Sequence, residues 1–218
     1  MPSGTRWAVL KAQESARNTT QEDALQELLK NGLGKAQIFA RSYVLPNICC
    51  TQKLAKELAS ESLTPAPGTR GFTGWHADII YLFRRKTVIA INDETRFTLF
   101  IPGLVKKDFA QFEKVLIHHL EQALDLAGAN RAQIAQAKLL LGGFSYYKTH
   151  NRSVLGTLND MKVGLDYILK VRLGRLPETE TEYRRIVTSL NDTPCKGKDL
   201  QGVVFPKREM LNMIDAAG

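Results

Sequence analysis

The alternation of hydrophobic and polar residues is clearest in the middle of the chain. Three successive runs rich in β-branched and aromatic residues, GWHADIIYLFRR, KTVIAIND and TRFTLFIPG, lie within residues 74–103. The joints between them are short enough for hairpins, so the pattern predicts an antiparallel meander over residues 75–101. The middle run is apolar on both faces, which favours a place at the centre of a sheet with helices over at least one side.

Further elements are predicted on both sides of the meander. RSYVLPNICC and FSYYKTH are typical of strands, near residues 43–50 and 144–149. Phenylalanine and leucine recur at helical spacing over residues 109–124, which predicts one long helix. Thr51 and Ser153 are the expected N-caps of two other helices. The remaining helices are predicted from Thr20 to Gly32, from Asn130 to Gly142, and in two segments after residue 174.

The order of these elements determines the fold class that we expect. Helices and strands do not alternate regularly, so the sequence predicts an α+β protein with an antiparallel sheet. We expect an N-terminal helical extension over residues 1–42 and an α+β core domain over residues 43–173. A C-terminal helical segment over residues 174–218 should pack on that core.

Composition limits the compartment and the chemistry. The chain has 218 residues, and no apolar run approaches the roughly 18 residues that a membrane helix needs. The N-terminus lacks the apolar core of a signal peptide, so we expect a cytoplasmic protein without a membrane partner. Cys49 and Cys50 are adjacent, and in a strand they would point to opposite faces, so at least one should be a small core residue. The net charge of +8 is spread thinly, which gives only a weak bias toward polyanions.

The stretch THNRSVLGTLND gathers polar side chains between two apolar segments. A helix beginning at Ser153 would present free N–H groups beside an arginine, which suits a carboxylate or phosphate. The alternative is a helix cap with a polar network that ties the helix to the sheet and to the segment CTQKL, with Arg152 and Asp160 facing each other. Both interpretations stay open. The candidate residues are Asn151, Arg152, Ser153, Asn159 and Asp160.

No complete catalytic or metal-binding motif is present. His76 and Asp78 would share one face of a strand, which suits a metal ion or an acid–base pair, but neither H-E-x-x-H nor C-x-x-C completes the set. The simpler interpretation is an exposed polar strand face, so we expect no metal and no cofactor. Cys50 could meet His76 in space, although no spacing requires it. His76 and Lys53 are kept as ligand candidates beside the late motif.

Basic residues form the second group of candidates. Three of them occupy the tip of the first hairpin, and a further pair would lie one turn apart on a helix. Basic groups with aromatic neighbours can bind a nucleic-acid strand, whereas the alternative is a solvated charged rim. The nucleic-acid candidates are Arg84, Arg85, Lys86, Arg172 and Arg175.

Three segments together resemble a known family. They are CTQKLAKEL, WHADIIYLFRRKTVIAINDETRFTLFIPG and NRSVLGTLNDM, and their content and order are similar to a family of uncharacterised bacterial proteins, domain of unknown function 6933. The resemblance covers about residues 48–168. Leu158 stands where methionine is common, and His76 stands where tyrosine is frequent. The residues before Tyr43 extend beyond the shorter relatives. The resemblance implies no established activity.

From these observations we expect a non-catalytic binding or interaction protein of bacterial or mobile-element origin, with nucleic acid or another protein as partner. The alternative is an enzyme or small-ligand binder that acts on a phosphate- or carboxylate-bearing substrate through residues 151–160. A homo-oligomer built through the N-terminal helix stays open as a third case.

Overall fold

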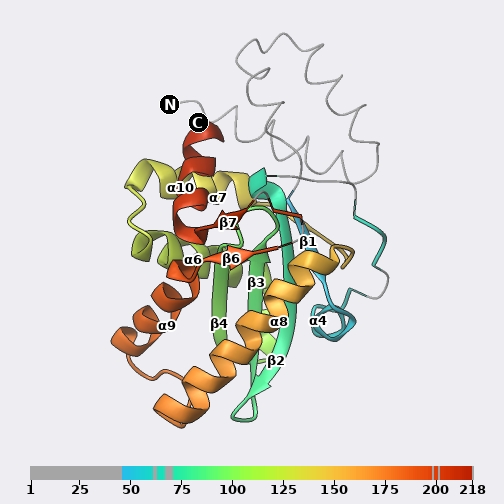
Figure 1. The fold of residues 1–218 in the computed structure, drawn as a ribbon. Coiled ribbons are helices and arrows are strands. Elements are labelled where there is room, and N and C mark those ends of the chain that lie inside the picture. Colours follow the sequence, from blue (N-terminus) through green and yellow to red (C-terminus); the bar gives the residue numbers. More distant parts are fainter. Residues whose placement is uncertain (1–45, 61–62, 67–70, 198, 201, 218) are drawn as a thin grey trace, which may run out of the picture. The chain divides into compact units, whose positions relative to one another are not determined.

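The computed structural model describes residues 46–60, 63–66, 71–197, 199–200 and 202–217 (Figure 1). The chain from Leu45 to Gly218 forms one compact unit. The predicted N-terminal extension over residues 1–42, and the part of the first predicted strand before Pro46, lie outside the described residues.

A five-stranded sheet forms the centre of this unit, in the order β4-β3-β2-β1-β5. The antiparallel meander β2-β3-β4 is confirmed, but β1 runs parallel to both of its neighbours, β2 and β5. The sheet is therefore mixed, and the expectation of a purely antiparallel sheet is wrong. Parallel pairing needs a long crossover, which the segment holding α4 supplies between β1 and β2. The strands are β1 (Asn47–Cys50), β2 (Gly74–Leu82), β3 (Arg85–Asn92), β4 (Thr98–Leu104) and β5 (Ser145–Lys148).

The helices largely match the sequence patterns, and Thr51 is confirmed as the N-cap of α4. The long helix expected over residues 109–124 is two helices, because the backbone at Gln111 leaves the helical region with φ −125°. The apolar spacing continues across this break, so the pattern could not reveal it. The helices are α4 (Gln52–Glu57), α5 (Lys106–Ala110), α6 (Phe112–Leu126), α7 (Arg131–Leu141), α8 (Arg152–Tyr167), α9 (Glu180–Asp192) and α10 (Pro206–Ala217). Shorter elements are the 3-10 helix η1 (Gly71–Thr73), the π-helical η2 (Ile168–Leu173) and the strands β6 (Cys195–Lys196) and β7 (Val203–Val204).

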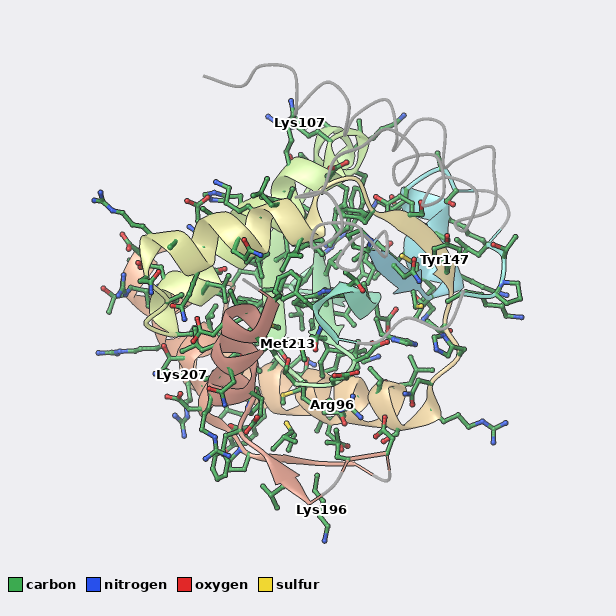
Figure 2. The ribbon with its side chains drawn as sticks, turned by 90° about the horizontal axis from the view of Figure 1, so that it is seen from above. Arg96, Lys107, Tyr147, Lys196, Lys207 and Met213 are labelled. Atoms are coloured by element: carbon green, nitrogen blue, oxygen red, sulfur yellow. The ribbon has the colours of Figure 1, made fainter. Side chains whose placement is uncertain are left out.

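Helices cover both faces of the sheet, which makes three layers and confirms the α+β class. α8 crosses one face, and α6 and α7 lie on the other (Figures 1 and 2). α9 contacts β4 and α6, and α10 contacts α7 and α9. No helix in the described part of the chain is long and apolar enough to cross a membrane.

The core is continuous on the α6 side and interrupted on the α8 side. Trp75, Ala77 and Cys50 point toward the large apolar cluster that α6 and α7 complete. The first half of α8 instead packs a small separate cluster, in which Val154 and Leu158 meet Ile91 of β3. Polar side chains of β1 and β2 fill the sheet face beside this small cluster, and they form the site described next.

Candidate metal centre

Cys49 is placed by strand alternation. Its neighbour Cys50 belongs to the large apolar cluster, so Cys49 points to the opposite face, beneath α8. The register of the sheet puts Cys49 level with His76 on β2 and with Tyr147 on β5. One of the two cysteines is thus a core residue, as expected. The other lies beside a histidine.

His76 is fully buried, and contacts at both of its ring nitrogens hold the ring in place. Its Nδ1 lies 2.6 Å from Oδ1 of Asp93, in the turn after β3. A carboxylate only accepts, so Nδ1 carries the hydrogen and Nε2 keeps its lone pair. The backbone N–H groups of His150 and Asn151 approach Nε2 at 3.4 Å, longer than the usual hydrogen bond. The lone pair of Nε2 is therefore only weakly engaged.

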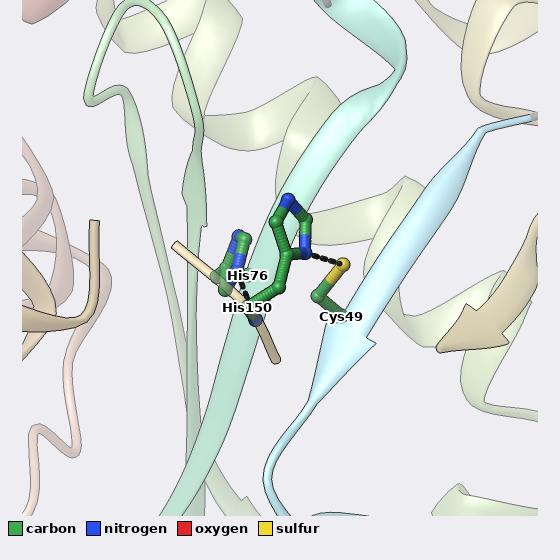
Figure 3. A group of neighbouring side chains, drawn as sticks. All are labelled: Cys49, His76 and His150. Atoms are coloured by element: carbon green, nitrogen blue, oxygen red, sulfur yellow. Dashed lines mark hydrogen bonds between the residues drawn. The ribbon is translucent and has the colours of Figure 1, made fainter. Parts of the chain in front are cut away.

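His150 brings the third side chain from the residues just before α8. Its Nδ1 lies 3.6 Å from Sγ of Cys49, and its ring centroid lies 5.0 Å from that of His76 (Figure 3). The three potential ligand atoms of Cys49, His76 and His150 lie within 4.8 Å of one another. His150 is exposed whereas the other two residues are buried, so the group opens toward solvent on one side.

This arrangement has the chemistry of a transition-metal site. Zinc binds sulfur at about 2.3 Å and nitrogen at about 2.0–2.1 Å, which puts neighbouring ligand atoms of a tetrahedral site roughly 3.5 Å apart. The Cys49–His150 separation of 3.6 Å already fits, and the nitrogen of His76 needs a shift of about 1.3 Å at most, from 4.8 Å to roughly 3.5 Å. A carboxylate on the far nitrogen of a ligating histidine is the usual outer partner, and Asp93 takes that place. Three protein ligands leave a fourth position open.

The surroundings of Cys49 favour the neutral thiol. Burial, and to a lesser degree the negative charge of Asp93, raises the pKa of the Cys49 thiol to about 12. The thiol is therefore neutral at physiological pH in the absence of a cation. A bound metal ion would remove the proton outright, because the thiolate is the ligand.

The residues at the start of α8 have other local roles than the sequence predicted. Asn151 is the N-cap, accepting from the N–H groups of Ser153 at 2.9 Å and Val154 at 3.2 Å, so the expectation that Ser153 is the cap is wrong. The cap of α8 lies two residues before the expected one, so Ser153 lies in the first turn of the helix. The hydroxyl of Ser153 and Nδ2 of Asn151 both donate to the carboxylate of Asp199.

The other members of the late motif do not converge with these residues. Arg152, Asn159 and Asp160 are exposed, and no ion pair joins Arg152 to Asp160, so the expectation that they face each other is wrong. Lys53 is also exposed, on α4.

A polar network does tie α8 to the sheet and to the segment CTQKL, but it runs through Asp78, Thr51 and Lys162 and not through Arg152 and Asp160. Asp78 is only 8 % exposed, and it accepts from Nζ of Lys162 on α8 at 2.7 Å. It also accepts from Oγ1 of Thr51, in the segment CTQKL, at 2.5 Å. The expectation of an exposed polar face at His76 and Asp78 is therefore wrong, because both side chains are buried under α8.

The five basic candidates divide into two that are paired with carboxylates and three that are exposed. Lys86 is paired with Glu57 at 2.6 Å, and Arg175 is paired with Glu182 at 2.8 Å. Gly174, in the left-handed region at φ 69°, ends the helix, so Arg175 does not lie one helical turn after Arg172. Arg84 and Arg85, at the hairpin tip, and Arg172 are exposed. Nucleic-acid binding by these residues stays a prediction.

Comparison with known proteins places the chain in a family. A family model described as a domain of unknown function (DUF6933) matches residues 47–209. The chain belongs to the DUF6933 family. The match extends the resemblance seen in the sequence, about residues 48–168, through α9 and into α10. No curated protein and no solved structure matches the chain.

Sequence reasoning about this DUF6933 chain missed Cys49, Asp93 and His150 as a group. No metal was expected, because no short-spaced ligand motif is present in the sequence. These residues are far apart along the chain: they come from β1, from the turn between β3 and β4, and from the residues just before α8. One available signal was the alternation of Cys49 and Cys50, which sends one thiol away from the core. Another was the position of His150 directly before the most specific motif of the family resemblance.

Proposed function

We propose that this protein binds a transition-metal ion of the zinc class through Cys49, His76 and His150, and that the ion holds a small oxygen-donor ligand at its fourth position. The observation that supports this proposal is the convergence of three ligand atoms within 4.8 Å, with Asp93 bonded behind His76. Sites with three protein ligands and one open position are typical of catalytic zinc. Metal-bound water or a polarised carbonyl or phosphoryl oxygen is the chemistry that such a centre offers.

This proposal favours the small-ligand alternative from the sequence over nucleic-acid binding. Two of the five basic candidates are paired with carboxylates, which lowers the positive charge available to phosphates. Nucleic-acid binding keeps its own test. A mobility shift of DNA and RNA probes at low salt would support it, and the absence of any shift would refute it.

The test of the metal centre is titration of the metal-free protein with Co²⁺ and Zn²⁺. We expect one equivalent to bind, with a thiolate-to-cobalt charge-transfer absorption in the near ultraviolet and the visible bands of tetrahedral cobalt. Cys49→Ser and His150→Gln should each weaken binding by at least about 100-fold, since each removes a ligand. Asp93→Asn should weaken binding by about 10- to 100-fold, since it removes only the outer partner.

The matched control is Cys50→Ala, because Cys50 is the adjacent thiol and faces the apolar core. It should retain the charge-transfer absorption and the affinity. If the protein binds no metal, or if Cys49→Ser and Cys50→Ala bind it equally, His76 is a structural histidine held by Asp93 and two backbone amides, and the proposal is refuted.

A further inference from the structure

Arg96 is a buried cation with unused hydrogen-bond donors. It follows the β3–β4 turn, lies on the α8 side of the sheet (Figure 2) and has no exposed surface. Its Nη2 donates to Oδ1 of Asp199, whereas Nε and Nη1 have no hydrogen-bond partner among the described residues. Leaving donors of a buried guanidinium unpaired is costly, so such groups call for an acceptor.

Asp199 is the acceptor that Arg96 has, and other donors surround the same carboxylate. Its Oδ1 also accepts from Oγ of Ser153 at 2.5 Å, and its Oδ2 accepts from Nδ2 of Asn151 at 3.0 Å. Burial alone would raise the pKa of Asp199, but the hydrogen bonds from Ser153, Arg96 and Asn151 outweigh it and hold the pKa at about 2. Asp199 is thus an anion held by three side chains from two other segments of the chain.

The donors are arranged as in an anion site. Asn151 and Ser153 occupy the start of the 16-residue helix α8, where the helix dipole favours negative charge. Arg96, from the connection between β3 and β4, adds a fixed positive charge beside the same oxygen that Ser153 binds. Gly197 passes so close that a Cβ there would come within 2.8 Å of Oγ of Ser153 and 2.9 Å of Oδ1 of Asp199. Only glycine lets the segment approach closely enough to place Asp199 among these donors.

We propose that Arg96, Asn151 and Ser153 form a binding site for a phosphoryl group, and that Asp199 is its intramolecular occupant, which the ligand displaces. A carboxylate has two oxygens and leaves two donors of Arg96 unpaired. A phosphoryl group brings a third oxygen and a second negative charge, so it matches the donor set better than Asp199 does. The site stands on these contacts alone and does not depend on metal binding.

The experiment is isothermal titration of the full chain with inorganic phosphate and with phenyl phosphate, with a chelator present and ionic strength held constant with chloride. In the wild-type protein phosphate has to compete with Asp199, which lowers the apparent affinity by the fraction of sites that are vacant. Asp199→Ala should therefore bind phosphate at least about tenfold more tightly than wild type. Tighter binding of phenyl phosphate than of phosphate would identify a monoester as the ligand, and the reverse order would identify the free ion.

Two variants make the result specific. Asp166→Ala removes a carboxylate whose partner is the exposed Lys170, so it changes the net charge equally and should bind phosphate as wild type does. In Asp199→Ala combined with Arg96→Met, the gain in affinity should disappear. If Asp199→Ala does not fold, Asp199→Asn is titrated in its place. The proposal is overturned if neither Asp199 variant binds phosphate more tightly than Asp166→Ala, or if the gain survives the loss of Arg96.

Discussion

His119 links α6 to α9 and to the sheet, and it makes the stability of this protein depend on pH. Its Nδ1 lies 2.8 Å from the hydroxyl of Tyr183, and that hydroxyl donates to the carbonyl of Phe100 at 3.2 Å. A hydroxyl has one hydrogen, so Nδ1 of His119 must donate to it. Burial first, and the neighbouring His118 second, lower the pKa of His119 from 6.5 to about 4.

The sign and size of the effect follow from this pKa. His119 stays neutral in the folded protein down to about pH 4, whereas the unfolded chain takes up a proton near pH 6.5. The unfolded state therefore binds more protons in this window, and the free energy of unfolding falls as the pH falls. A shift of about 2.5 pKa units corresponds to a loss of up to about 3 kcal/mol, complete once the pH is below the folded pKa.

The assay is urea unfolding followed by tryptophan fluorescence, repeated from about pH 7 to about pH 4 for wild type and His119→Gln. As the pH falls across this window, the wild type should lose unfolding free energy relative to His119→Gln. Taking the difference between the two proteins cancels the contributions of the other titrating groups. His118→Gln removes a histidine from the exposed side of the same helix and should keep most of the dependence, because burial is the larger cause of the shift. Parallel curves for wild type and His119→Gln would refute the reasoning.

Three further predictions follow from other contacts. Asp78→Ala should destabilise the fold by about 3 kcal/mol, because it leaves Lys162 of α8 without its carboxylate partner. Adding Lys162→Met should recover most of that loss; urea unfolding of both variants checks this, and no recovery would count against it. Asn92→Ala should lower the free energy of unfolding by about 2–4 kcal/mol, because the buried amide donates to three backbone carbonyls in η1 and at the first residue of β2. A smaller loss, measured by urea unfolding, would show that water replaces the amide. Arg175→Ala should raise the pKa of Glu182 from about 2 toward 4.5, because the hydrogen bond from Arg175 is the main cause of the low value. The substitution removes stability that is present above about pH 4.5 and is lost as the pH falls to about pH 2. An unchanged titration of the Glu182 carboxyl by NMR would contradict this.

Several local features could be predicted because the information is local. The alternation in the three β-rich runs predicted the meander β2-β3-β4, and Thr51 predicted the start of α4. The cap of α8 could not be chosen from the sequence, since Asn151 and Ser153 are both good caps two residues apart. The structure identifies Asn151, because its side chain accepts from the N–H groups of Ser153 and Val154. The family resemblance, over about residues 48–168, included the residues around the start of α8 that contribute to both candidate sites. It did not include β6, β7 or the segment that holds Asp199.

The candidate sites could not be predicted because tertiary packing assembles them. Whether β1 pairs parallel or antiparallel decides which side chain lies level with His76, and no local pattern encodes that register. Cys49 and His150 are separated by 101 positions in the chain, and Arg96 and Asp199 by 103. Interactions over such separations depend on the packing of α8 on the sheet.

The sequence alone determined the α+β class, the three central strands and the helices that flank them, since these follow from the period of apolar residues and from turn and cap chemistry. Only the tertiary structure decided that Cys49 meets two histidines, that Asp78 is buried, and that Arg96 pairs with Asp199 while its Nε and Nη1 find no partner among the described residues. The physical reason is that periodicity fixes which face of an element is buried. The identity of the groups that meet there is set by strand register and by the way one helix crosses the sheet.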